Sequence, residues 1–83
     1  MSIMEEIADG LARKALEVSL REDDEKIVKL MADAIANSSP TLEEAFLTAV
    51  RFRRGEYRAM LVLDAHMAKL DAGESEPAEE AEE

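Results

Sequence analysis

The side chains with the best potential for chemistry are one histidine, a set of arginines and many carboxylates. The chain contains His66 as its single histidine and has no cysteine, so any nucleophile–base pair would have to use His66. Carboxylate metal sites in helical bundles use Glu-x-x-His, but Leu63 stands three residues before His66. We therefore expect no enzyme, and no catalytic, metal or cofactor-binding residues.

Three arginines offer a different chemistry, the binding of anions. Arg51, Arg54 and Arg58 are spaced to lie along one face of a helix, where they could contact phosphate groups. The alternative is a solvated face with pairs inside the helix. The chain has no tryptophan and a formal net charge of −10, which disfavours base stacking and a globally basic nucleic-acid binder.

These groups are carried by a long predicted helix, residues 42–70. Thr41 and Glu44 match the capping-box pattern at its start, and Pro40 disfavours helix through Ser39. An apolar arc keeps its helical phase from Leu42 to Leu70, and we expect the helix to continue through Gly55. A kink or break at Gly55 is the alternative, because glycine following two arginines is also typical of a helix end.

The apolar arc of this helix predicts an interface. Arg53 and Glu56 lie on or beside the arc, and a polar pair in an apolar seam can fix the register of a partner helix. In a two-fold dimer Arg53 of one chain could face Glu56 of the other. The candidate interface residues are Phe46, Val50, Arg53, Glu56, Tyr57, Met60, Leu63 and Met67.

Two shorter helices are predicted before the long one, at about 3–18 and 20–36. Ser2 and Glu5 form a capping box at the first start. The apolar arcs of the two segments fall out of phase, so the chain must bend between Val18 and Asp24. Either Ser19 with Glu22, or an aspartate at 23 or 24, could cap the second helix. The fold class is therefore all-α, a small bundle of three helices, or four if Gly55 breaks the last.

Composition divides the chain into a helical domain, 1–70, and an acidic tail, 71–83. The tail carries seven acidic residues and no large apolar side chain, and we expect it to be disordered. A folded part of about 70 residues has a thin core, which favours self-association or a partner. No segment predicts a signal peptide or a membrane span, so a cytoplasmic location is expected.

The sequence favours a non-enzymatic protein–protein interaction module, a homodimeric adaptor or regulator that assembles through its long C-terminal helix. An unknown protein partner is a further expectation. The alternative is a nucleic-acid-associated regulator that contacts phosphates through Arg51, Arg54 and Arg58. No motif identifies the partner or the process.

Overall fold

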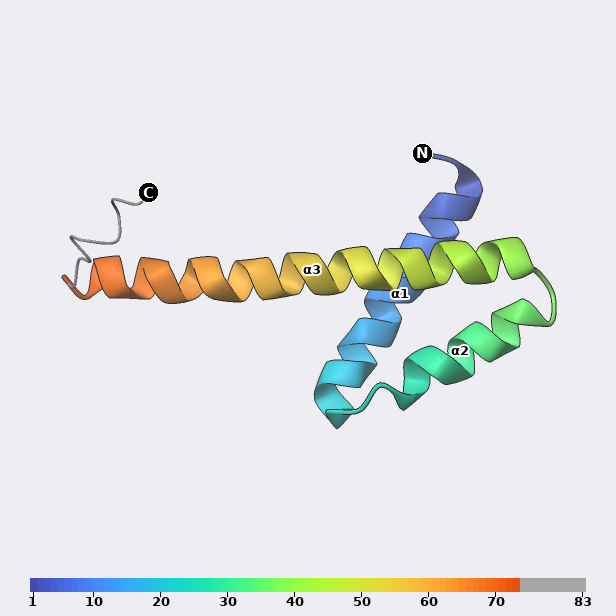
Figure 1. The fold of residues 1–83 in the computed structure, drawn as a ribbon, viewed down its shortest axis with the longest axis horizontal. Helices are drawn as coiled ribbons and strands as arrows, with labels where there is room; N and C mark the ends of the chain where they lie inside the picture. Colours follow the sequence, from blue (N-terminus) through green and yellow to red (C-terminus); the bar gives the residue numbers. More distant parts are fainter. Residues whose placement is uncertain (74–83) are drawn as a thin grey trace.

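The fold was derived from a computed structural model, which describes residues 1–73 of the chain. Three helices make up this part: α1 (Ile3–Glu22), α2 (Lys26–Ala36) and α3 (Pro40–Asp71). Figure 1 shows α1 and α2 crossing and flanking one half of α3, while the other half extends beyond them. The all-α class with three helices is confirmed. Most of the predicted acidic tail, 71–83, lies outside the described residues.

The start of α1 follows the predicted capping box. The backbone N–H of Glu5 donates to Ser2 Oγ at 3.1 Å, and the Ser2 N–H donates to Glu5 Oε1 at 3.1 Å. These reciprocal bonds satisfy two backbone donors that the first helical turn would otherwise leave unpaired.

The cap of α3 differs from the prediction. Ser39, not Thr41, is the N-cap, and its Oγ accepts the backbone N–H of Leu42 at 3.1 Å. Pro40 occupies the first turn, where its missing N–H costs no hydrogen bond. Thr41 lies inside the helix, so Thr41 is not the boundary residue. Two cap patterns overlap here, because Ser39-Pro40 stands two residues before the Thr-x-x-Glu pattern that begins at Thr41. The helix uses the earlier one.

The break between the first two helices falls within the expected segment, but the helix bounds differ from the prediction. α1 continues to Glu22 and ends where Asp23 adopts a left-handed conformation, with φ 55°. α2 begins at Lys26 and not near residue 20, because the chain reverses at Asp23. Asp24 Oδ1 accepts the Lys26 N–H at 2.8 Å, so an aspartate supports the start of α2.

The core is small and depends on alanine. The buried residues of α1 are Ala8, Ala12 and Ala15, each at most 1% exposed. Phe46 and Val50 of α3 pack into the cluster that contains Ala12 and Ala15, and α2 adds Val28 and Ala32. Large side chains therefore come mainly from α3, and small ones from α1.

α3 runs through Gly55 without a break, as expected. It has 32 residues, which corresponds to about 48 Å. The longest dimension of the molecule is 54 Å, and its radius of gyration is 17.4 Å. A compact chain of this size would have a radius near 11 Å. The length of α3 thus makes the protein elongated.

Candidate apolar assembly site

The second half of α3 lacks intramolecular cover. Every described residue from Gly55 to Gly73 is exposed, and we call residues 55–71 the overhang. Four of its large apolar side chains are spaced alternately three and four residues apart, so they lie on one face. These are Met60, Leu63, Met67 and Leu70, each about half exposed.

Of the predicted interface residues, the overhang also holds Tyr57 and Glu56. Tyr57 is 46% exposed and lies at the edge of the apolar face, one turn before the first methionine of that face. Monomeric proteins rarely expose a contiguous apolar patch without a function for it. The overhang is therefore the strongest candidate for a binding surface in the described part of the chain.

Phe46 and Val50 do not belong to this surface. Their exposures are 0% and 2%, because α1 and α2 cover the first half of α3 within the same protomer. The apolar arc of α3 continues through both halves, but α1 and α2 cover only the first half. The sequence pattern could not reveal where the intramolecular contacts stop.

Arg53 connects α3 to α1. Its Nε donates to Asp9 Oδ1 at 2.8 Å and its Nη2 donates to Asp9 Oδ2 at 2.7 Å. Its Nη1 donates to Glu56 Oε1 at 3.0 Å within α3. The bidentate contact fixes the relative orientation of the two helices at the base of the overhang. Arg53 is thus engaged within the protomer, and its contact with Glu56 of a second chain stays a prediction.

The same contacts shift two titrations. Hydrogen bonds from Arg53 lower the pKa of Asp9 below its ordinary value. In return, hydrogen bonds from Asp9 and Glu56 raise the pKa of Arg53. Asp9 was not singled out in the sequence, because its partner lies 44 residues away and no local pattern signals the contact.

The three arginines of the anion-binding alternative do not form one free ridge. Arg54 turns toward the body, where its Nη2 lies 3.2 Å from Glu25 Oε1, and only a quarter of its side chain is exposed. Arg51 and Arg58 are exposed on the outer side of α3. Nucleic-acid contact through these residues stays a prediction, with two of its three side chains accessible.

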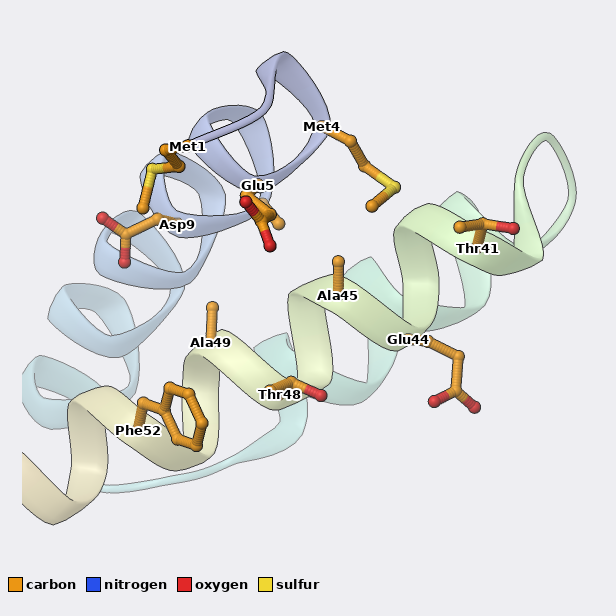
Figure 2. Close-up of a pocket in the computed structure, with 11 residues that line it drawn as sticks. Met1, Met4, Glu5, Asp9, Thr41, Glu44, Ala45, Thr48, Ala49 and Phe52 are labelled. Atoms are coloured by element: carbon orange, nitrogen blue, oxygen red, sulfur yellow. The ribbon is translucent and has the colours of Figure 1, made fainter.

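A groove between the N-terminal turns of α1 and the first half of α3 was not predicted. Its volume is about 420 Å³. Figure 2 shows Met4 extending from α1 toward α3, where Ala45 and Ala49 present only methyl groups to the space between the helices. Phe52, 74% exposed, ends the groove on the side of the overhang. Glu5, Glu44 and Thr48 add polar groups at its margins.

His66 is exposed on the overhang. Among residues 1–73, no three histidine or carboxylate side chains come together in a group that could hold a metal ion. In that part of the chain, no helix is both long enough and apolar enough to cross a membrane.

Comparison with known proteins gives no relative from which to transfer a function. No protein-family model, curated protein sequence or solved structure matches the chain.

Proposed function

We propose that this protein is a non-enzymatic interaction module that forms a homodimer through the overhang of α3 and acts as an adaptor or regulator. The observation that carries the proposal is the exposed apolar face of Met60, Leu63, Met67 and Leu70. A helix whose residues are all exposed gains no tertiary packing, and most helical stability in proteins comes from such packing. A second chain supplies what the protomer lacks.

The size of the available surface fits a dimer. A half-exposed leucine or methionine leaves on the order of 100 Å² of side chain in water. The overhang face, with Tyr57 and the adjoining Phe52, then offers on the order of 600 Å² per protomer. A stable complex buries about 800 Å² per partner, so a modest contribution from a second region completes the interface.

Sedimentation equilibrium across a range of protein concentrations tests the proposal. We expect a dimer mass for the wild-type chain at tens of micromolar and a melting temperature that rises with concentration. Leu63→Asp places a charge in the apolar face and should give a monomer in which the core of α1, α2 and the first half of α3 stays folded. Val62→Asp is the matched control, because Val62 is 72% exposed and lies on another side of the same helix.

A wild-type chain that stays monomeric at these concentrations contradicts the proposal. Equal weakening of the dimer by both variants would also contradict it, since the effect would then come from charge or helix propensity and not from the face.

A further inference from the structure

We infer that the overhang of each protomer docks antiparallel into the α1–α3 groove of a second copy. This inference rests on the proposed homodimer and adds its geometry: which surfaces meet, and in which direction the two α3 helices run. The groove residues that receive the partner are Met4, Ala45, Ala49 and Phe52.

Helical periodicity places the groove and the overhang on one continuous face of α3. Eighteen residues make five full turns, so positions 18 apart point in the same direction. Ala45 is followed 18 residues later by Leu63, and Ala49 by Met67. Phe52 is related to Leu70 in the same way. The face therefore carries small side chains where the groove lies and large ones where the overhang is bare.

The lengths of the two regions also match. The overhang comprises residues 55–71, about 25 Å of helix, and the half of α3 beside the groove comprises residues 40–54. A two-fold axis near Glu56, the midpoint of α3, would overlap the two helices along their full length. Met67 of one copy then meets Ala45 of the other, and Leu63 meets Ala49.

This pairing sets large side chains against small ones on both sides of the axis. Methionine and leucine would fill the space left by the two alanines, as interlocking helix surfaces require. Met4 lies at the mouth of the groove, and its flexible side chain can adapt to the incoming helix. A parallel pairing would instead place the overhangs against each other and leave both grooves empty.

Paired cysteine substitutions test the geometry, because the natural chain contains no cysteine. We would combine Ala45→Cys with Met67→Cys, and make each change alone as a control. The two positions lie on one helix, 22 residues and about 33 Å apart, so they cannot join within a chain. A disulfide needs Cα atoms within about 7 Å.

Under mild oxidation we expect the double variant to give a covalent dimer carrying two disulfides, while either single variant gives little. Efficient linkage of Met67→Cys alone would show a parallel dimer and overturn this inference while leaving the proposed homodimer intact. The inference would also be overturned if the double variant is dimeric by sedimentation when reduced but forms no intermolecular disulfide on oxidation. A monomeric wild-type chain would remove both proposals together.

A second measurement avoids the need for bond geometry. Ala45→Trp fills the groove without changing the overhang, and we expect it to raise the dimer dissociation constant at least tenfold. Ala65→Trp is the control, because Ala65 lies on the opposite side of the overhang, and we expect less than a twofold change. An unchanged dissociation constant for Ala45→Trp would overturn docking in the groove.

Discussion

The two halves of α3 carry a similar apolar pattern but have different surroundings. In residues 40–54, Phe46 and Val50 are buried by α1 and α2. In residues 55–71, every side chain is exposed, including Leu63 and Met67. The comparison shows that an amphipathic pattern indicates which face of a helix will be covered. It does not indicate whether the cover comes from the same chain.

The polar contacts differ between the halves as well. Arg53 and Arg54 lie at the junction between the two halves of α3. Arg53 pairs with Asp9 of α1, and Arg54 pairs with Glu25, which directly precedes α2. The ion pair of Glu56 with Arg53, at the start of the overhang, lies within α3 itself. The following substitutions test how independent the two halves are.

The largest effect is expected in the covered half. Phe46→Ala should lower the free energy of unfolding by about 3–5 kcal/mol, because it empties a fully buried site. Met60→Ala, in the overhang, should cost much less when the chain is dilute enough to be monomeric. Urea unfolding followed by circular dichroism measures both, and similar losses would show that the halves are not distinct.

The start of the covered half should be the next most sensitive position. Ser39→Ala removes the cap of α3 and should cost about 1 kcal/mol. Thr41→Ala is the matched control, and we expect a change within about 0.5 kcal/mol because Thr41 is exposed inside the helix. The reverse order in thermal unfolding would place the cap at Thr41 after all.

The junction between the halves should tolerate, and gain from, a better helix former. Gly55→Ala should stabilise the chain by about 0.5–1 kcal/mol, since a Cβ there meets no atom within 4 Å. Helical content and melting temperature should both rise. A loss of stability would show that α3 needs to bend at Gly55, and that the overhang is hinged.

The smallest effect concerns acid. Because its pKa is lowered in the folded chain, Asp9 contributes stability above its ordinary pKa, near 3.8, and that contribution is lost as pH falls through the lower folded value. Asp9→Asn should therefore flatten the loss of stability below about pH 4. Glu6→Gln is a control on the same helix. If it flattens the pH dependence of stability as much as Asp9→Asn does, the contact of Asp9 with Arg53 is not the cause.

Local signals in the sequence predicted local structure well. The capping box at Ser2, the bend before Asp24 and the continuity through Gly55 each depend on neighbouring residues, and all are confirmed. The start of α2 was wrong because two overlapping cap patterns competed across residues 19–24. The cap of α3 was wrong for the same reason, between Ser39 and Thr41.

Long-range features could not be predicted from the sequence. The pairing of Asp9 with Arg53 and the groove beside Met4 depend on how α1 crosses α3, which no periodicity encodes. In α1 the large apolar residues Ile3 and Ile7 are exposed, whereas the smaller Ala12 is buried. The inward side of that helix is set by how closely it approaches α3, and small side chains allow that approach.

The alanine seam of α1 has a consequence for how this sequence can change over time. Ala8, Ala12 and Ala15 are at most 1% exposed, so the buried side of α1 presents methyl groups to its neighbours. Any larger side chain at these positions would have to push α1 away from α3, at a typical cost of 1–3 kcal/mol. Accepted substitutions at the three sites should be confined to residues no larger than serine, whereas the outward isoleucines can vary freely. Divergent sequences related to this chain should then be most similar to one another in α1 at the three buried alanine positions.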